Sequence, residues 1–343
     1  MRLNPKELFR PDEKNRIKLR WEAFAYLDDK IVHGIYNSKE PLEIYLDQCD
    51  IIGHDGLIWI LSLARWRKTL GLGATYVFLP HSETAISLIV DLDFPANLLR
   101  AGGIIGNENV LWGLGNRPNR PGFRRLVRTG GAYSPRSIQV VNSSTWANVY
   151  EALQRFFGED VSDLLGVVGS HNQLLAEDAT AFRETIGELV TNVALHGGPV
   201  GGSGLGYVCY RPWPRGYPLL RFCSADMGPG FSATLTRQLD RKFASEAEAI
   251  LYALAYRFHY PKEGVLGLYN ALPFIYQLGG RLQIRSLDAS VFLDLGSDDI
   301  AQIFETEYKK NPPVEWIRKI VKCRLSPKVP GCHLALDLRL PAS

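Results

Sequence analysis

Residues 183–198 read RETIGELVTNVALHGG and place Glu188 and Asn192 four residues apart. Four residues make about one turn of an α-helix, so both side chains leave the same face. Apolar residues recur at helical spacing and supply a buried face: Ile186, Leu189, Val190, Val193 and Ala194. A carboxylate beside a carboxamide suits Mg²⁺ and a nucleotide, because Mg²⁺ prefers oxygen ligands and substrate phosphates. Taken alone, the same spacing is also common at the solvated edge of an ordinary helix.

The composition is that of a globular protein rather than of a disordered or membrane-spanning chain. Apolar residues make up 46% and charged residues 22% of the chain. Its length of 343 residues is enough for two domains with separate cores. The longest apolar runs, such as residues 57–64, are much shorter than the roughly 20 residues of a membrane span. The first residues, MRLNPKELFRPDEK, are too charged for a signal peptide. We therefore expect a cytoplasmic protein without membrane contacts.

Cysteines and net charge exclude other classes. Five cysteines are scattered without CxxC spacing, which predicts reduced thiols rather than a disulfide framework or a structural zinc site. The formal charge of +3 is too small by itself to indicate nucleic acid. Between residues 109 and 150, however, there are six arginines and no acidic residue, a run that suits nucleic acid or an acidic protein surface. A solvated linker that docks on its own protein is the favoured interpretation.

The N-terminal half predicts a small α/β domain. Residues 1–30 form a leader to which we assign no chemistry. Strand patterns at residues 42–46 and 74–79 enclose a helical pattern over residues 56–70 that ends at Gly71. This alternation predicts helices on one side of a sheet. Residues 106–135, rich in Gly, Pro, Asn and Arg, predict a basic linker.

The C-terminal half contains two glycine-bearing stretches. In the sequence ADMGPG, Asp226 ends a predicted strand, and glycines follow it. Such a carboxylate can accept a hydrogen bond from an exocyclic amine while the backbone approaches a flat ring. Gly264 and Gly267 open a further helical stretch, where free N–H groups and the helix dipole favour phosphate. LQIRS and VFLDL predict a hairpin, and CHLALDLRL predicts a last strand.

Residues 31–105 resemble the STAS fold of bacterial anti-anti-sigma factors. LEIYLDQCDIIGHDGLIWILSLARWRKTLGLGATYVFLP has that fold's order of strand, loop, helix and strand, with a glycine after the loop. In that family the residue before this glycine is typically a serine that a partner kinase phosphorylates, and here it is Asp55, after His54. A serine kinase cannot esterify an aspartate, and the charge of Asp55 suits a helix N-terminus. Asp55 would either fix a phosphate-like state or, as we favour, act as a simple N-cap.

Residues 136–343 resemble the GHKL ATPase fold of histidine kinases, heat-shock chaperones, gyrase B, MutL and anti-sigma serine kinases. The stretches ELVTNVALHGG, ADMGPGF, GVLGL, GGRLQIRS and PGCHLALDLRLP carry the resemblance in order and spacing, and the serine kinases are nearest. It implies a two-layer α/β sandwich that binds ATP and Mg²⁺, with Asn192 as Mg²⁺ ligand, Glu188 as general base and Asp226 on the adenine amine. The resemblance assigns further positions to the ring or the phosphates: Gly228 and Gly230 to the ring, and Gly264, Gly267 and Leu268 to the phosphates.

The resemblance also implies a lid over residues 231–263. Its basic residues are candidates for the γ-phosphate: Arg237, Arg241, Lys242, Arg257 and Lys262, with Lys262 favoured because it adjoins the glycines. Three departures from the family pattern stand out. Family members often carry a threonine in the last strand that helps to hold the adenine-binding carboxylate, and the resemblance assigns that position in this chain to Ala335. Residues 297–325 form an insertion, either a partner surface or a decoration. The absence of a helix pair with a phosphoacceptor histidine argues against autophosphorylation.

Together these features predict an α/β (α+β) protein in which a STAS-like domain precedes a GHKL domain. The expected function is that of a Mg-ATP-binding regulator, ATPase or serine-kinase-like, which acts through nucleotide-dependent contacts with a protein partner such as a sigma-factor-type regulator. Two alternatives stay open. One is a non-catalytic ATP-dependent switch, and the other, which is less favoured, is a nucleic-acid-linked ATPase. The family also makes a homodimer an expected assembly.

Overall fold

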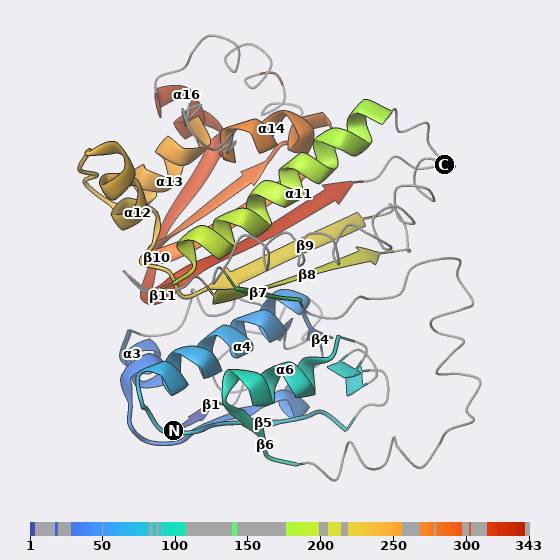
Figure 1. Cartoon of the computed structure of the whole chain (residues 1–343), viewed down its shortest axis with the longest axis vertical. Helices are drawn as coiled ribbons and strands as arrows, with labels where there is room; N and C mark the ends of the chain where they lie inside the picture. The colour runs from blue at the N-terminus through green and yellow to red at the C-terminus, as the bar shows by residue number, and fades with distance from the viewer. Residues whose placement is uncertain are drawn as a thin grey trace. The chain divides into compact units, whose positions relative to one another are not determined.

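The computed structural model describes residues 1–3, 18–19, 29–49, 51–81, 85–86, 89–90, 92–107, 139–142, 176–198, 205–213, 219–255, 268–277, 279–296, 302 and 314–339. It combines helices with a parallel sheet and an antiparallel sheet (Figure 1), which confirms the predicted α/β (α+β) class. The chain divides into two compact units, the first built from Met1–Ile138 with the short segments Cys209–Arg211 and Pro327–Val329, and the second built from the rest of the chain.

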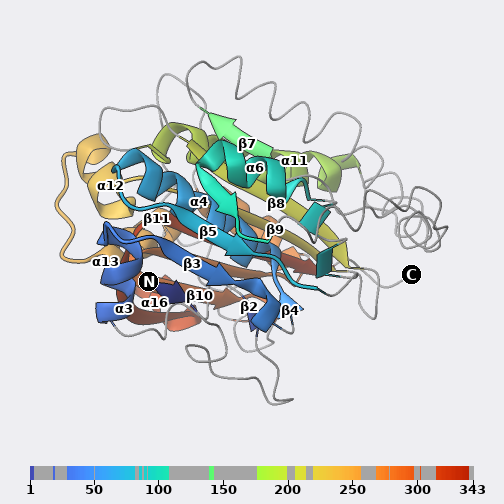
Figure 2. The same ribbon diagram turned by 90° about the horizontal axis from the view of Figure 1, so that it is seen from below.

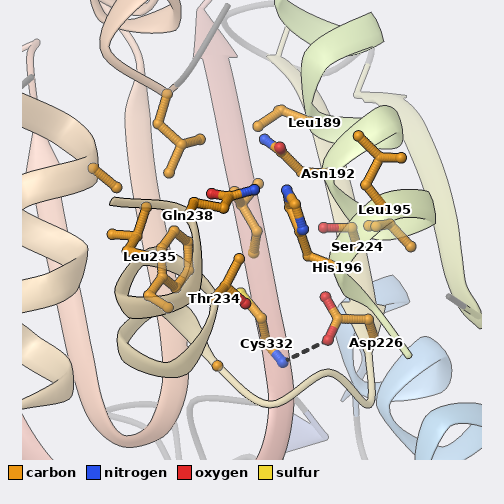
Figure 3. Close-up of a pocket in the computed structure, with 16 residues that line it drawn as sticks. Leu189, Asn192, Leu195, His196, Ser224, Asp226, Thr234, Leu235, Gln238 and Cys332 are labelled. Atoms are coloured by element: carbon orange, nitrogen blue, oxygen red, sulfur yellow. Dashed lines mark hydrogen bonds between the residues drawn. The ribbon is translucent and has the colours of Figure 1, made fainter. Parts of the chain in front are cut away.

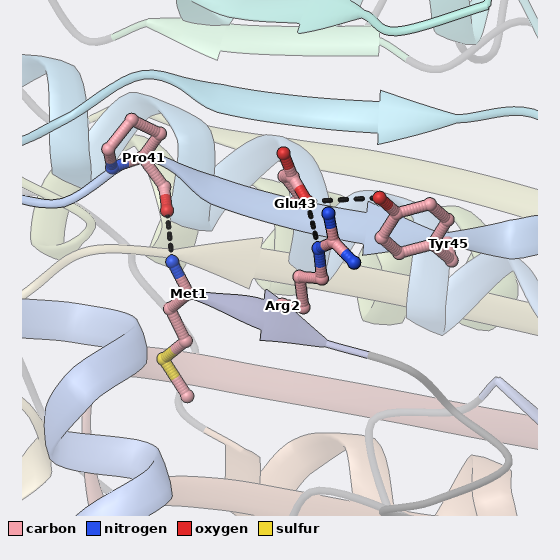
Figure 4. Close-up of polar contacts among 5 residues, drawn as sticks. All are labelled: Met1, Arg2, Pro41, Glu43 and Tyr45. Carbon is pink, nitrogen blue, oxygen red and sulfur yellow. Dashed lines mark hydrogen bonds and ion pairs between the residues drawn. The ribbon is translucent and has the colours of Figure 1, made fainter.

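The first unit is built on a four-stranded parallel sheet in the order β1-β3-β5-β6 (Figure 2). Its strands are β1 (Arg2–Leu3), β3 (Leu42–Tyr45), β5 (Thr75–Phe78) and β6 (Gly103–Ile105), and β2 (Lys18–Leu19) pairs separately with β4 (Ile51–Ile52). Side chains alternate along β3, with Leu42 and Ile44 fully buried. On its other face Glu43 accepts hydrogen bonds of 2.9 Å from both Arg2 and Tyr45 (Figure 4).

The described helices of the first unit include α3 (Asp29–Asn37), the 3₁₀ turn η1 (Leu46–Gln48), α4 (His54–Thr69) and α6 (Phe94–Ala101). α4 packs against both α3 and α6. The buried Arg67 of α4 donates to the carbonyls of Ile35, Glu40 and Gly73 at 2.6, 2.7 and 3.0 Å. These bonds give both terminal nitrogens of the buried guanidinium an acceptor and hold α4 against the end of α3. As predicted, the chain leaves α4 through Gly71, whose φ is +62°.

The second unit is built on a five-stranded sheet in the order β10-β11-β9-β8-β7. Its strands are β7 (Gln139–Asn142), β8 (Leu205–Trp213), β9 (Leu219–Asp226), β10 (Arg281–Asp294) and β11 (Val321–Arg339). β11 pairs antiparallel with β9, and β7 pairs antiparallel with β8. Directly opposite residues of an antiparallel pair share a face, so Ser224 of β9 and its partner Leu334 of β11 point the same way.

β10 is folded back on itself. The N–H of Leu295 donates to the carbonyl of Gly280 at 2.9 Å, and Arg281 forms an ion pair with Asp294 at 2.7 Å, so the two ends of the element lie side by side. The reversal falls at Leu287, where φ is +46°. This is the hairpin that the sequence predicts for LQIRS and VFLDL.

The helices of the second unit are α11 (Ala176–His196), α12 (Phe231–Leu239), α13 (Glu246–Ala255), α14 (Leu268–Gln277) and α16 (Val314–Ile320). α11 packs on β7, β9 and α14, and α13 packs on β10, α12, α14 and α16 (Figure 1). Ala249, Ile250 and Leu254 of α13 are fully buried. α13 is therefore a core helix, and the prediction of a lid across the whole of residues 231–263 is wrong for this helix. Residues 256–263 lie outside the described residues.

The end of the predicted insertion 297–325 also belongs to the core. Ile317 and Ile320 of α16 are 0% and 2% exposed and face α13, and β11 begins directly afterwards at Val321. The interpretation of this part as a decoration is therefore wrong, because its removal would uncover α13. Within the rest of the insertion only residue 302 is described, so its interpretation as a partner surface stays a prediction.

Candidate functional site

A pocket with a cavity volume of about 140 Å³ lies in the second unit between the helices and the sheet (Figure 3). Its walls are largely apolar and come from four helices and a strand: Leu189 and Val193 of α11, Leu235 of α12, Ala253 of α13, Leu268 of α14 and Leu334 of β11. Its polar side chains come from α11, α12, β9 and β11: Asn192, His196, Ser224, Asp226, Thr234, Gln238 and Cys332. An apolar cavity with a few convergent polar groups is the usual form of a small-molecule site.

α11 carries the two residues with which the sequence prediction began. Its apolar face is buried, and Asn192 lines the pocket together with His196, which follows one turn later. Glu188 lies one turn before Asn192 and is partly buried, but it is not among the pocket-lining residues. Burial lowers the pKa of His196, and the Arg237 cation lowers it further, so this imidazole is neutral at pH 7.

Asp226 ends β9 at the bottom of the pocket and is 7% exposed. Its Oδ1 accepts hydrogen bonds from the backbone N–H groups of Gly228 at 2.8 Å and Cys332 at 2.9 Å. The other carboxylate oxygen points up into the pocket (Figure 3). Burial raises the pKa of Asp226 to about 6, although the two backbone hydrogen bonds lower it. The carboxylate is ionised at neutral pH in an environment that penalises its charge.

The glycines after Asp226 allow a close approach of the backbone. A Cβ on Gly228 would lie 2.0 Å from the carbonyl oxygen of His196, so any side chain there would push the loop away from the end of α11. Gly230 has φ +90° and lines the pocket directly at the start of α12. The need for glycine at both positions comes from the packing of this loop on neighbouring elements, and the contact of these glycines with a ring stays a prediction.

Glu246, at the start of α13, is a buried carboxylate to which the sequence analysis assigned no role. It accepts hydrogen bonds from the N–H groups of Phe231 and Ser232 at 2.6 and 3.0 Å, and from the Ser232 hydroxyl at 2.6 Å. The hydroxyl of Ser286 on β10 is its fourth donor. Glu246 therefore caps the N-terminus of α12, a wall of the pocket, and ties it to α13 and β10.

The last strand presents different residues to the pocket than the sequence comparison assumed. Leu334 and Cys332 of β11 line the cavity, whereas Ala335 pairs with Cys223 on the opposite face of the sheet. Ala335, to which the adenine-side position was assigned, therefore does not line the pocket. Burial raises the pKa of the Cys332 thiol well above its usual value, and the charges of Asp226 and Glu246 raise it further. This thiol is protonated and a weak nucleophile at neutral pH.

The structure brings together some of the predicted site residues. Asn192, Asp226, Gly230 and Leu268 line one pocket, and Gly228 adjoins it through its hydrogen bond to Asp226. Lys262, Gly264 and Gly267 lie outside the described residues, as does Arg257. The polar residues that sequence reasoning missed follow from simple periodicities: His196 lies four residues after Asn192 on a helix, and Ser224 lies two before Asp226 on a strand.

Two of the basic candidates for the γ-phosphate, Arg241 and Lys242, do not line the pocket. The guanidinium of Arg241 lies 4.5 Å from the ring centroid of Tyr252 and 5.4 Å from that of Phe243, and 4.0 Å from the Glu248 carboxylate. Its neighbour Lys242 is exposed, and neither residue lines the pocket. Arg237 is exposed on α12, near enough to His196 to lower its pKa.

In the first unit, the start of α4 differs from the favoured interpretation of Asp55. The N-cap of α4 is Gly53, which makes no side-chain capping bond, and Asp55 lies within the first turn. Asp55 is 2% exposed, so its charge is buried near the positive end of the helix dipole. The N-cap interpretation is therefore wrong, and a fixed phosphate-like state stays a prediction.

No protein-family model matches this chain, no curated protein matches it, and no solved structure matches it. Among the described residues there is no group of three or more His, Cys, Asp or Glu side chains that could hold a metal ion. Nor does the described part of the chain contain a helix long and apolar enough to cross a membrane. The geometry of the pocket is therefore the basis for any functional assignment.

Proposed function

We propose that the second unit binds ATP with Mg²⁺ and that the protein regulates a protein partner in a nucleotide-dependent way. The observation that carries the proposal is Asp226, an ionised carboxylate at the bottom of an apolar pocket. One carboxylate oxygen accepts backbone hydrogen bonds from Gly228 and Cys332, and the other points into the cavity, where an amine of a bound ligand would donate to it.

The pocket favours a flat ring with a single exocyclic amine. Val193, Leu235 and Leu334 offer apolar surface for ring faces, and Asp226 accepts from the amine. Adenine presents one amine beside ring acceptors, whereas guanine presents an amine and a ring N–H together, which a carboxylate best accepts with both oxygens. Since Oδ1 of Asp226 already accepts two backbone N–H groups, adenine is the better match.

The metal would arrive with the nucleotide. Mg²⁺ commonly binds one or two protein oxygens together with phosphates and water, so Asn192 on the pocket wall fits a Mg-nucleotide better than a free ion. Asn192 would hold the ion, which neutralises phosphate charge when it is bound. Glu188, one turn earlier on α11, would accept the proton of an attacking hydroxyl or water.

The protein partner is proposed on the resemblance to the anti-sigma serine kinases and on a STAS-like first unit. The strand–helix–strand order of β3, α4 and β5 is compatible with this comparison. Two further predictions, a homodimer and contacts of the arginine run with nucleic acid, have no support from the described residues, and most of that run lies outside them.

Titration calorimetry of the full chain with ATP, in the presence and absence of Mg²⁺, tests the proposal. We expect wild type to bind ATP more tightly with Mg²⁺ than without it. Asn192→Ala should lose at least about tenfold of ATP affinity in Mg²⁺ and keep its affinity for adenosine, because only the metal contact is removed. Gln277→Ala, an exposed change on α14, is the matched control. Failure of wild type to bind ATP would refute the proposed function.

A non-catalytic ATP-dependent switch is the second candidate. It is favoured by the position of Glu188 outside the pocket-lining residues. Release or transfer of labelled γ-phosphate by wild type, and its loss in Glu188→Gln with unchanged ATP affinity, would favour the catalytic form. Binding without any turnover would favour the switch.

A further inference from the structure

Ser224 is a buried hydroxyl that faces the pocket. It lies in β9, is 6% exposed and is one of the pocket-lining residues (Figure 3). The hydrogen bonds found among the described residues include none made by its side chain, in contrast to the buried hydroxyl of Ser286, which donates to Glu246. A hydroxyl that faces a cavity can form a hydrogen bond with a ligand that fills the cavity.

The strand geometry places this hydroxyl beside Asp226. Residues two apart on a strand point to the same face, at a spacing of roughly 6.5 Å along the strand, so Ser224 and Asp226 project into one cavity. Leu334 is the cross-strand partner of Ser224, and its side chain is apolar. The hydroxyl and the carboxylate are thus two polar groups set in an otherwise apolar part of the wall.

We propose that Ser224 is a specificity-determining residue that recognises a ring nitrogen adjacent to the amine of the bound base. This inference rests on the proposed function. The amine donates to Asp226, and the hydroxyl of Ser224 donates to the neighbouring ring nitrogen, which is an acceptor in adenine. Together the two contacts select a base with an amine donor next to a ring acceptor. A base that lacks the acceptor leaves the Ser224 hydroxyl without a hydrogen bond inside the complex.

The test measures the affinity of wild type and Ser224→Ala for ADP, 1-deaza-ADP and 7-deaza-ADP, since each analogue lacks one of the two ring nitrogens next to the amine. We expect wild type to bind ADP about tenfold more tightly than one of the analogues, the loss typical of one buried hydrogen bond. Ser224→Ala should bind ADP about tenfold more weakly than wild type and should not discriminate against that analogue. Ser224→Cys, with a weak donor of similar size, should behave in the same way and guards against a folding defect in the alanine variant.

Ser286→Ala is the matched control, because it removes a buried hydroxyl of the same unit outside the pocket. It should keep the discrimination of wild type. If wild type binds ADP but both Ser224 variants keep its affinity and discrimination, the inference is wrong while the proposed function stands. If wild type does not bind ADP at all, the proposed function fails first.

Discussion

The bottom of the pocket and the N-terminus of α12 each bury one carboxylate of the second unit, and the two regions use that carboxylate differently. Glu246, at the N-terminus of α12, is 4% exposed and accepts from four donors on α12 and β10. Asp226, at the bottom of the pocket, is 7% exposed, accepts two backbone N–H groups on one oxygen and turns the other toward the cavity. Burial alone therefore does not mark a ligand site, because only one of these carboxylates faces a space that a ligand can enter.

The hydrogen bonds of Glu246 also limit where phosphates can bind. A helix N-terminus is a favourable anion site because its first N–H groups are not used within the helix. At α12 the N–H groups of Phe231 and Ser232 already donate to Glu246. A nucleotide that places its ring at Asp226 must therefore direct its phosphates away from this helix end, and Asn192 on α11 is the polar pocket residue proposed to meet them through Mg²⁺.

The largest expected effect comes from removing the structural carboxylate. Glu246→Ala leaves two partly buried backbone N–H groups and two hydroxyls without their acceptor, and we expect it to lower the free energy of unfolding by about 3–5 kcal/mol. Urea unfolding followed by circular dichroism measures this loss. Glu248→Ala, two residues later on the more exposed side of α13, is the matched control and should cost less than about 1 kcal/mol. Equal losses of stability in the two variants would show that Glu246 stabilises the fold no more than Glu248 does.

Removal of the pocket carboxylate, Asp226, should change the free energy of unfolding in the opposite direction. The pKa of Asp226 is about 6 in the folded protein against an ordinary value of 3.8, so the folded state holds this proton more tightly. The tighter proton binding of the folded state stabilises it fully below pH 3.8, and this stabilisation is lost as the pH rises through 6. The loss amounts to about 3 kcal/mol at neutral pH. Asp226→Asn removes the buried charge and should stabilise the ligand-free protein by about 1–3 kcal/mol at pH 7.5.

Urea unfolding between pH 4.5 and 7.5 checks this prediction, since the gain from Asp226→Asn should shrink as the pH falls. The same variant should bind ATP about a hundredfold more weakly, because an amide N–H₂ directed at the ligand amine replaces an acceptor by a donor. Asp288→Asn, at an exposed carboxylate, is the control for both measurements. A destabilisation by Asp226→Asn that does not change with pH would contradict the raised pKa.

The features that the sequence predicted well are local ones. The amphipathic pattern around Asn192 and the strand end at Asp226 depend on residues within a few positions of each other, where period and glycine chemistry decide the structure. The role of Glu246 was missed because its donors lie 14 to 40 residues away, so no short pattern contains them. Arg67 likewise owes its burial to carbonyls as far away as Ile35.

Errors of register had larger consequences than errors of element type. In the last strand, Ala335 was assigned to the adenine side, but it lies on the face of the sheet opposite to the pocket-lining Leu334. At α4 a shift of two residues, from Asp55 to Gly53, changed a predicted cap into a buried carboxylate. Periodicity identifies an element, whereas assignment of a side chain to a face needs the pairing partner.

The smallest effect is expected at Arg241, a sequence-predicted candidate for the γ-phosphate that lies at neither carboxylate region. Its guanidinium packs on Tyr252 and Phe243 at the surface, so Arg241→Ala should cost about 0.5–1 kcal/mol of stability through the lost cation–π contacts. ATP affinity should change less than about twofold, because the side chain does not line the pocket. Lys242→Ala, at the exposed neighbouring residue, controls for the loss of one positive charge. A tenfold loss of ATP affinity in Arg241→Ala, with ADP affinity unchanged, would instead indicate that Arg241 contacts the γ-phosphate. The nucleotide site would then extend beyond the pocket around Asp226.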